Sequence, residues 1–208
     1  KKKIFLINSL LRKKIYIFKK KQTNEISNPI RILVLGGSQG AKFFDEKIKD
    51  LIFETSKLIK VYLIQQVYDK KKEQELKNFY KKIKLEHEIF GFDENLYKKF
   101  NTIDLAITRS GSIALSELSF YNVPFIAVPF PYAKDNHQFF NAKYFYDKNC
   151  CWLVSQSEFD VKIIKDFIIN LVKDKKEYFE KKDNLNKFSY QNNWNDINKK
   201  LLELINEY

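Results

Sequence analysis

The chain is poor in residues that bind metals or form disulfides. It has no methionine, two cysteines and two histidines. Cys150 and Cys151 are neighbours, so they cannot form the framework of a disulfide-stabilised domain, and we expect them to be small buried residues in a reducing compartment. His87 and His137 lack partners at metal-ligand spacing, and no Asp-x-Asp pair is present. We therefore predict no metal and no cofactor.

Long apolar runs are also lacking, and none approaches the ~18 residues of a membrane span. Residues 1 to 11 differ from a signal peptide because their apolar part is short, contains Asn8 and Ser9, and has no small-residue cleavage site. We expect a cytoplasmic protein. The missing initiating methionine predicts a fragment or a trimmed chain.

The composition indicates a folded globular protein with one large domain or at most two small ones, since 44% of the 208 residues are hydrophobic and 16% aromatic. The net charge of +12 is compatible with a nucleic-acid or anionic-membrane partner. Lys, Ile, Asn, Phe and Tyr are abundant together and share A/T-rich codons, so codon bias explains the basicity equally well.

Short apolar runs alternate with stretches of helical spacing, which predicts an α/β fold, a doubly wound parallel sheet of six strands. The runs that predict strands are residues 30 to 35, 61 to 66, 88 to 90, 103 to 107, 124 to 128 and 151 to 154. Residues 1 to 28 alternate apolar and basic stretches and precede Pro29, so we expect a linker or edge segment there and the domain in residues 29 to 208.

Three features predict helix starts and faces in the second half of the chain. Asp135 and Gln138 have the spacing of an N-cap and its reciprocal partner, and Ser157 is a candidate N-cap. The last predicted helix has an apolar face formed by Trp194, Ile197, Leu201 and Ile205.

Residues 31 to 41 combine an apolar strand, a glycine turn and a helix start. Gly36, Gly37 and Gly40 can adopt positive φ, and the backbone N–H groups of such a turn and of the helix N-terminus converge on an anion such as a diphosphate. Lys42 follows Ala41 without the Gly-Lys-Ser/Thr ending of a Walker A loop, and the spacing differs from Gly-x-Gly-x-x-Gly. A purely structural glycine turn is the alternative.

A second turn, at residues 109 to 112, follows the predicted fourth strand. In a sheet of order 3-2-1-4-5-6, strands one and four are neighbours at the point where the winding reverses, and ligands bind beyond their carboxyl ends. Both turns therefore belong to one crevice, which favours an anion site over two unrelated structural turns.

Further side chains are expected at the same edge of the sheet. Phe92 can stack on a base, or it is simply packed. Glu117 can accept two vicinal hydroxyls of a ribose, or it is an ordinary helix carboxylate. The residues from Asp135 to Gln138 can hydrogen-bond sugar hydroxyls, or they only cap the helix. Donors for a nucleotide sugar are plentiful, whereas candidate acids, bases and nucleophiles are few.

Four motifs in the order found in the MurG family give the chain a clear resemblance to it. They are Gly36-Gly-Ser-Gln-Gly-Ala41, Arg109-Ser-Gly111 followed by Ser116-Glu117, Val128-Pro-Phe130, and Asp135-Asn-His-Gln138 with Asn141-Ala142. The family transfers N-acetylglucosamine from UDP-N-acetylglucosamine to lipid I, forming lipid II in peptidoglycan synthesis. The resemblance covers the donor-binding, C-terminal half of a two-domain GT-B enzyme with two Rossmann-like domains.

The resemblance implies a role for particular residues of this chain. Ser38 and Gln39 belong to the loop that contacts the diphosphate, Phe92 and Asp93 flank the uracil, and Glu117 binds the ribose. His137, Gln138 and Asn141 hold the N-acetylglucosamine. Residues lining the diphosphate and ribose are Ser112, Ile113, Ala114, Leu115, Ser116 and Glu117.

Three positions depart from the family pattern or match it loosely. Arg12 corresponds to the arginine of an Asn-Pro-x-Arg junction that reaches the donor, although Ser9 replaces the proline and one residue is inserted. Asp93 stands where an aliphatic residue is usual, and Ala114 where threonine is common.

The resemblance implies an inverting, metal-independent hexosyltransferase, peripheral on the cytoplasmic face of the bacterial inner membrane. Lipid I binding, membrane contact and the catalytic base belong to a missing N-terminal domain, so we assign no catalytic residue here and no nucleic-acid partner. Two alternatives remain: a nucleotide-sugar-binding subunit of a split glycosyltransferase, inactive without a partner chain, and a basic RNA- or membrane-binding module.

Overall fold

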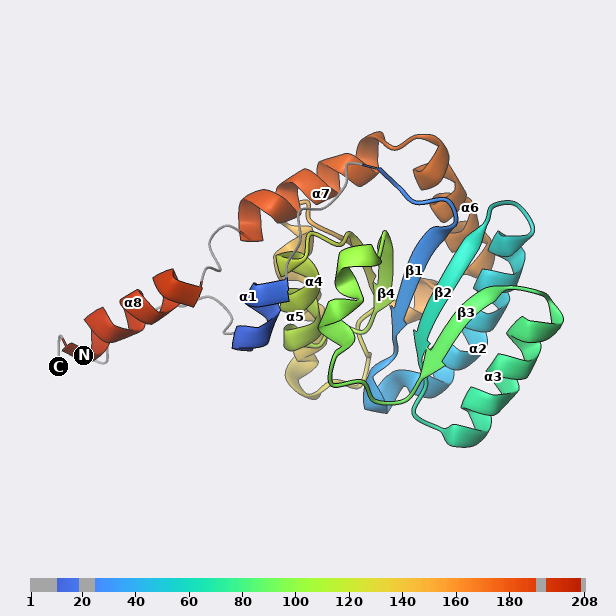
Figure 1. The fold of residues 1–208 in the computed structure, drawn as a ribbon, viewed down its shortest axis with the longest axis horizontal. Helices are drawn as coiled ribbons and strands as arrows, with labels where there is room; N and C mark the ends of the chain where they lie inside the picture. Colours follow the sequence, from blue (N-terminus) through green and yellow to red (C-terminus); the bar gives the residue numbers. More distant parts are fainter. Residues whose placement is uncertain (1–10, 19–24, 190–193, 207–208) are drawn as a thin grey trace.

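Six parallel strands form one sheet in the order β3-β2-β1-β4-β5-β6 (Figure 1). The computed structural model describes residues 11–18, 25–189 and 194–206, without the side chains of residues 38–41, 189 and 194–196. The strands are β1 (Ile30–Leu35), β2 (Val61–Gln66), β3 (Glu86–Phe90), β4 (Leu105–Thr108), β5 (Phe125–Ala127) and β6 (Trp152–Leu153). The predicted fold and strand order are confirmed. β3 begins earlier than predicted, whereas β4, β5 and β6 are shorter than the apolar runs that predict them.

Helices connect the strands and cover both faces of the sheet (Figure 1). The α-helices are α1 (Lys13–Phe18), α2 (Gly37–Ser56), α3 (Lys70–Lys82), α4 (Ser112–Phe120), α5 (His137–Tyr146), α6 (Val161–Lys173), α7 (Lys176–Ser189) and α8 (Trp194–Asn206). Short 3₁₀ turns are η1 (Leu96–Lys98), η2 (Phe100–Thr102), η3 (Lys134–Asn136) and η4 (Gln156–Glu158). Among the described residues, no helix is long and apolar enough to cross a membrane.

Two hydrophobic cores lie on opposite faces of the sheet because successive strand residues point to opposite sides. Ile32 and Val34 of β1 pack in the core under α2, α3 and α6. Leu33 and Leu35 pack in the other core, with residues of α1, α4, α5 and α7. Both cores therefore include residues of β1. The inner strands are continuously apolar because helices cover both of their faces.

Residues 11 to 18, which the sequence placed in a linker or edge segment, pack on the second core. Leu11 and Ile15 are buried there. The hydroxyl of Tyr121, at the end of α4, donates a hydrogen bond to the carbonyl of Ile15 at 3.1 Å. This contact holds α1 beside α4 and brings Arg12 to the carboxyl edge of the sheet.

Several local expectations were wrong. Asp135 does not cap α5: Asn136 precedes the helix in a left-handed conformation without a side-chain cap, and Asp135 has φ +51° inside η3. Ser157 caps no helix, because Ser155 caps η4 and Asp160 caps α6. In the last helix, Ile197 is buried but Ile205 is exposed, and the side chain of Trp194 lies outside the described part.

The two cysteines are free and buried, as predicted. Burial raises the pKa of Cys151 to about 12, so its thiol stays protonated and unreactive near neutral pH.

Candidate functional site

A cleft of about 670 Å³ opens at the carboxyl ends of β1 and β4. Leu35 of β1 pairs with Thr108 of β4, and the Arg109 N–H donates to the carbonyl of Leu35 at 3.0 Å, so the two turns are adjacent. This is the switch point of the sheet, where a doubly wound fold binds ligands. The residues lining the cleft are Leu35, Gly36, Gly37, Gln66, Tyr68, Phe92, Leu96, Thr108, Arg109, Gly111, Ser112, Ile113, Ala114, Glu117, Phe130, His137 and Gln138.

Two helix N-termini point into this cleft. α2 begins after Gly36 and α4 after Gly111, and no described side chain caps either of them. The first-turn N–H groups of both helices therefore lack an intrahelical acceptor and face a ligand together with the positive ends of two helix dipoles. Such a pair suits an anion with two charged groups, such as a diphosphate.

Gly37 is the glycine whose conformation shapes this turn. Its φ is +65°, a left-handed value that residues with a Cβ rarely adopt. Gly36, which could also adopt a positive φ, has an ordinary right-handed conformation. The side chains of Ser38 and Gln39 lie outside the described part, so their roles stay predictions.

Glu117 places a buried carboxylate in the cleft from the second turn of α4. Its side chain is 8% exposed, and Oε1 lies 3.4 Å from Nη2 of Arg12. Burial raises the pKa of the Glu117 carboxyl, and the nearby positive charge of Arg12 opposes part of that rise. A carboxylate held inside a cleft, whose Oε2 accepts no hydrogen bond from the part of the chain that the structure describes, is suited to a vicinal diol.

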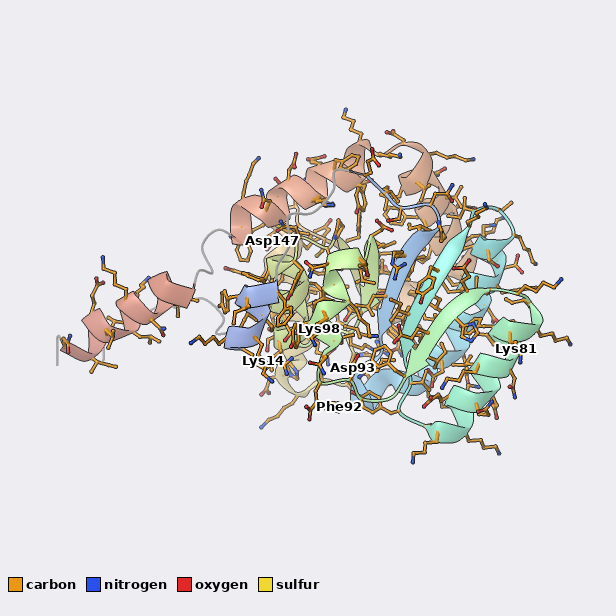
Figure 2. The ribbon with its side chains drawn as sticks, viewed as in Figure 1. Lys14, Lys81, Phe92, Asp93, Lys98 and Asp147 are labelled. Atoms are coloured by element: carbon orange, nitrogen blue, oxygen red, sulfur yellow. The ribbon has the colours of Figure 1, made fainter. Side chains whose placement is uncertain are left out.

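Phe92 and Asp93 follow β3 and lie at the lower edge of the sheet in Figure 2, and Phe92 lines the cleft. The Phe92 ring is 77% exposed, so a large apolar face is left uncovered in the structure. The Asp93 carboxylate turns to its own loop, where it accepts from the Asn95 N–H at 2.8 Å and pairs with Lys99. Asp93 therefore orders the loop that presents Phe92, and its side chain does not line the cleft.

Gln138 is fixed by the turn that it faces. Its Oε1 accepts from the N–H groups of Ser110 and Phe130 at 3.1 and 3.0 Å. Its amide nitrogen has no hydrogen-bond partner among the described residues and is left as a donor at the cleft. The structural role of Gln138 is therefore this long-range contact with Ser110 and Phe130, and not a capping pair with Asp135.

His137 and Asn141 differ in what their side chains contact. The Nδ1 of His137 lies 2.7 Å from the carbonyl of Lys134, and the exposed ring lines the cleft. The Asn141 amide donates to the carbonyl of Ser110 at 3.0 Å and does not line the cleft. Asn141 thus holds the second turn in place.

The predicted residues of α4 separate by helix face. Ser112, Ile113, Ala114 and Glu117 line the cleft. Leu115 and Ser116 are buried on the opposite side, because residues of one helix cannot all face one cleft. Only their backbones remain near it.

Arg109 is a residue of the cleft that the sequence placed in a turn but not among the binding residues. Its guanidinium donates to the carbonyls of Val128 and Pro129, both at 3.1 Å, and to Gln156 Oε1 at 2.5 Å. It also lies over aromatic rings of Phe43, Phe44 and Phe130. Burial lowers the pKa of Arg109 to about 10, so the group is charged at neutral pH and adds positive potential to the cleft.

Metal-ligating groups do not gather in the described part of the chain. No set of three or more His, Cys, Asp and Glu side chains there is arranged to hold a metal ion.

The architecture is that of a Rossmann-like domain with a crevice at the switch point of its sheet. A family description, the glycosyltransferase family 28 C-terminal domain, matches residues 31–199. This chain belongs to that family.

Similar proteins agree with this assignment. The UDP-N-acetylglucosamine–N-acetylmuramyl-(pentapeptide) pyrophosphoryl-undecaprenol N-acetylglucosamine transferase of Pelagibacter ubique is 40% identical over 207 residues, which is 100% of this chain and 57% of the relative. The Rickettsia bellii protein of the same name is 32% identical over 161 residues, covering 75% of this chain and 44% of that protein. The chain therefore matches about half the length of these relatives.

A solved structure supports the fold. The crystal structure of Acinetobacter baumannii MurG matches 83% of this chain and 48% of its own, with a TM-score of 0.66 and 22% identity. This likeness shows that the domain has the fold of one half of a GT-B glycosyltransferase.

Proposed function

We propose that this chain is the donor-binding half of an enzyme that transfers N-acetylglucosamine from UDP-N-acetylglucosamine to lipid I, giving lipid II. The proposal rests on one observation. A single cleft combines a buried carboxylate, Glu117, two uncapped helix N-termini and a free amide donor on Gln138. In a nucleotide sugar, the carboxylate matches the ribose, the two helix N-termini match the diphosphate, and the amide of Gln138 matches the sugar.

In the bound state, the uracil lies against Phe92 and the two ribose hydroxyls donate to Glu117. The diphosphate lies between the N-termini of α2 and α4, where first-turn N–H groups donate to its oxygens. Arg12, which precedes α1, reaches the ribose end of the cleft through its contact with Glu117. The amide nitrogen of Gln138 and the ring of His137 bind the sugar.

The reaction is a displacement at the anomeric carbon with inversion. A hydroxyl of the acceptor forms the new bond as the bond to UDP breaks, and negative charge grows on the departing diphosphate. The fixed N–H groups, two helix dipoles and Arg109 stabilise that charge more in the transition state than in the ground state. Because these groups already supply positive potential, we propose a reaction that does not depend on a metal.

The relatives are longer than this chain, and we place the acceptor-activating base and the membrane contact in the part that they have beyond it. Lipid I is a membrane lipid, so the whole enzyme would be peripheral on the cytoplasmic face of the bacterial inner membrane. We propose no nucleic-acid partner.

Calorimetric titration of the chain with UDP-N-acetylglucosamine, in EDTA and at moderate salt, tests the donor assignment. Saturable binding is expected, with weaker binding of UDP-glucose because the N-acetyl group is missing. A folded protein that gives no heat, or equal affinity for the two sugars, contradicts the proposal. If the chain binds no nucleotide sugar but binds a polyanion with an affinity that falls steeply as the salt concentration rises, a nucleic-acid module is favoured instead.

A further inference from the structure

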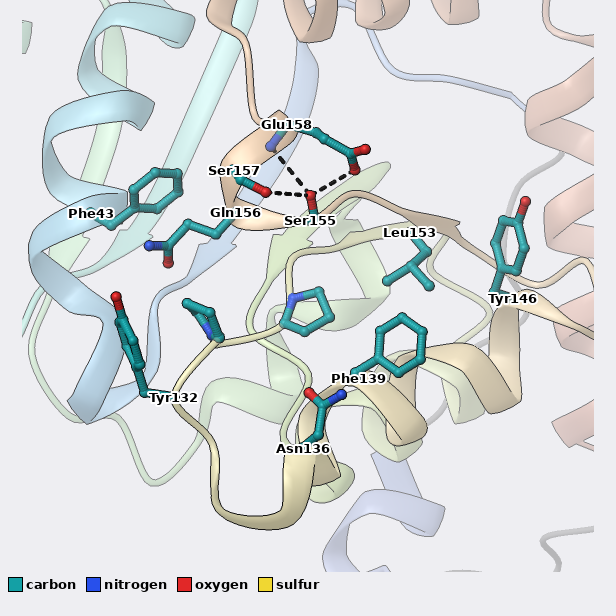
Figure 3. Close-up of a pocket in the computed structure, with 12 residues that line it drawn as sticks. Phe43, Tyr132, Asn136, Phe139, Tyr146, Leu153, Ser155, Gln156, Ser157 and Glu158 are labelled. Atoms are coloured by element: carbon teal, nitrogen blue, oxygen red, sulfur yellow. Dashed lines mark hydrogen bonds between the residues drawn. The ribbon is translucent and has the colours of Figure 1, made fainter.

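A second hollow of about 680 Å³ lies beside the donor cleft, beyond the carboxyl ends of β5 and β6. It is bounded by the first half of α2, the loop between β5 and α5, one side of α5 and the loop that contains η4. Figure 3 shows the aromatic side chains of Phe43, Tyr132 and Phe139 on different sides of this hollow. We call it the β5–β6 hollow.

The β5–β6 hollow and the donor cleft share one wall. Phe130 lines the cleft, whereas its neighbours Pro129 and Pro131 line the hollow. The rings of Phe130 and Tyr132 pack edge to face with centroids 5.6 Å apart. On the same wall, Arg109 lines the cleft and donates to Gln156, which lines the hollow.

The lining is apolar with a polar end. Tyr132 is 83% exposed, and Phe139 and two prolines add further apolar surface. On the η4 side, the Ser155 hydroxyl donates to the Glu158 carboxylate at 2.6 Å, as Figure 3 shows, and Gln156 adds an amide. Asn136 adds a second amide on the opposite side, beside Phe139. Rigid aromatic and proline faces together with hydrogen-bonding groups suit a short peptide of small residues.

The position of the hollow relative to the proposed donor indicates which peptide could bind there. Phe92 lies at the base end of the cleft and Gln138 at the sugar end. The hollow lies next to the sugar end, because Asn136 of its lining and His137 and Gln138 of the cleft are consecutive. A ligand in the hollow therefore lies close to the sugar end of the proposed donor site.

We propose that the β5–β6 hollow binds the peptide of the acceptor. The inference rests on the proposed function and concerns a different ligand from the donor. In an N-acetylmuramyl pentapeptide the peptide is attached through a lactyl ether to the ring carbon next to the one with the reacting hydroxyl. When that hydroxyl points at the anomeric carbon, the peptide must therefore leave the cleft within about one sugar ring of it.

This placement gives the donor domain a part in selecting the acceptor. A bound peptide packs against Gln156, whose side-chain oxygen holds the Arg109 guanidinium beside the diphosphate site. Acceptor recognition and the positive potential at the leaving group are thereby connected through a single hydrogen bond.

The test uses this chain saturated with UDP, titrated with soluble N-acetylmuramyl pentapeptide while the aromatic resonances are followed by NMR. Saturable shifts are expected for Tyr132 and Phe139, and N-acetylmuramic acid without the peptide should give far smaller ones. Tyr132→Ala should weaken pentapeptide binding by about tenfold, through loss of an aromatic face. Phe140→Ala is the matched control, since Phe140 is 60% exposed on the same helix as Phe139 but lines neither hollow nor cleft.

Calorimetry with UDP-N-acetylglucosamine on the same three proteins separates the two proposals. Unchanged donor affinity, with pentapeptide binding weakened only by Tyr132→Ala, supports the inference. The inference is overturned if the donor binds but the pentapeptide shifts no resonance of the hollow. It is also overturned if Tyr132→Ala binds the pentapeptide like the wild type, or if N-acetylmuramic acid binds as tightly as the pentapeptide. Failure of the donor to bind the wild type contradicts the proposed function instead.

Discussion

The Nη2 of Arg12 lies 3.4 Å from Oε1 of Glu117, which is 105 positions further along the chain. Arg12 belongs to the segment before the first strand, and Glu117 belongs to the helix that opens at the switch point. The contact brings a cation to the carboxylate that we propose for the ribose. The positive charge of Arg12 opposes the rise in the pKa of Glu117 that burial causes, since an opposite charge favours the ionised form.

Glu117→Gln should weaken the binding of UDP by about 1 to 3 kcal/mol, because hydrogen bonds to a charged acceptor are replaced by weaker ones. Calorimetry with UDP measures the effect without a contribution from the sugar. Glu54→Gln, which alters an exposed carboxylate paired with Lys57, is the matched control and should leave the affinity unchanged. Equal UDP affinity in wild type and Glu117→Gln would exclude the ribose role.

Gly37→Ala should destabilise the protein more than Gly111→Ala. Alanine at position 37 must adopt φ +65°, which costs about 1 to 2 kcal/mol. Gly111 has φ −66° and ψ 134°, and an added Cβ meets no atom within 4 Å, so alanine there is unstrained, and its gain through the unfolded state offsets the weaker N-cap. Urea unfolding of both variants measures the difference. Equal effects of the two substitutions would refute the conformational argument for Gly37.

Gln138 should have two separable roles. Gln138→Ala removes the acceptor of two backbone N–H groups, which should cost about 1 to 3 kcal/mol of stability. Gln138→Glu keeps an acceptor for both but loses the amide donor. The ratio of the UDP-N-acetylglucosamine and UDP affinities should therefore fall in Gln138→Glu while the protein stays nearly as stable. A ratio equal to that of the wild type would rule out the sugar contact.

The framework of the fold could be predicted because it depends on local pattern. The runs at residues 30 to 35 and 61 to 66 became strands with the same bounds, and the strand order followed from alternation with helices. β5 and β6 are shorter than predicted because pairing with a neighbouring strand, rather than apolar content, sets where a strand ends.

The contacts within the cleft were less predictable because they join distant segments. Gln138 was assigned to a capping pair from its spacing, yet its oxygen accepts from Ser110 and Phe130, and no sequence interval reveals that. Arg109 was overlooked as a binding residue because its partners are carbonyls after β5, a glutamine in η4 and rings on α2. Burial of an arginine becomes visible only once those elements are assembled.

Asp45 provides a last prediction, on pH and stability. This residue of α2 is 4% exposed and accepts from Gln65, whose own oxygen accepts from the Tyr80 hydroxyl at 3.1 Å. Burial raises the pKa of Asp45 to about 6. The folded state therefore binds this proton more tightly than the unfolded state, and the stability that the proton provides is lost as pH rises from about 4 through about 6.

Asp45→Asn should remove that loss, because the neutral amide still accepts from Gln65 and has no proton to release. Relative to wild type, the variant should gain about 1 to 3 kcal/mol of stability between pH 4 and pH 8. Urea unfolding at both pH values gives the difference, and subtracting the wild type cancels the titration of all other groups. Asp147→Asn, an exposed residue paired with Lys143, is the control and should show a much smaller change. A difference between Asp45→Asn and wild type that is the same at both pH values would mean that Asp45 ionises normally in the folded protein.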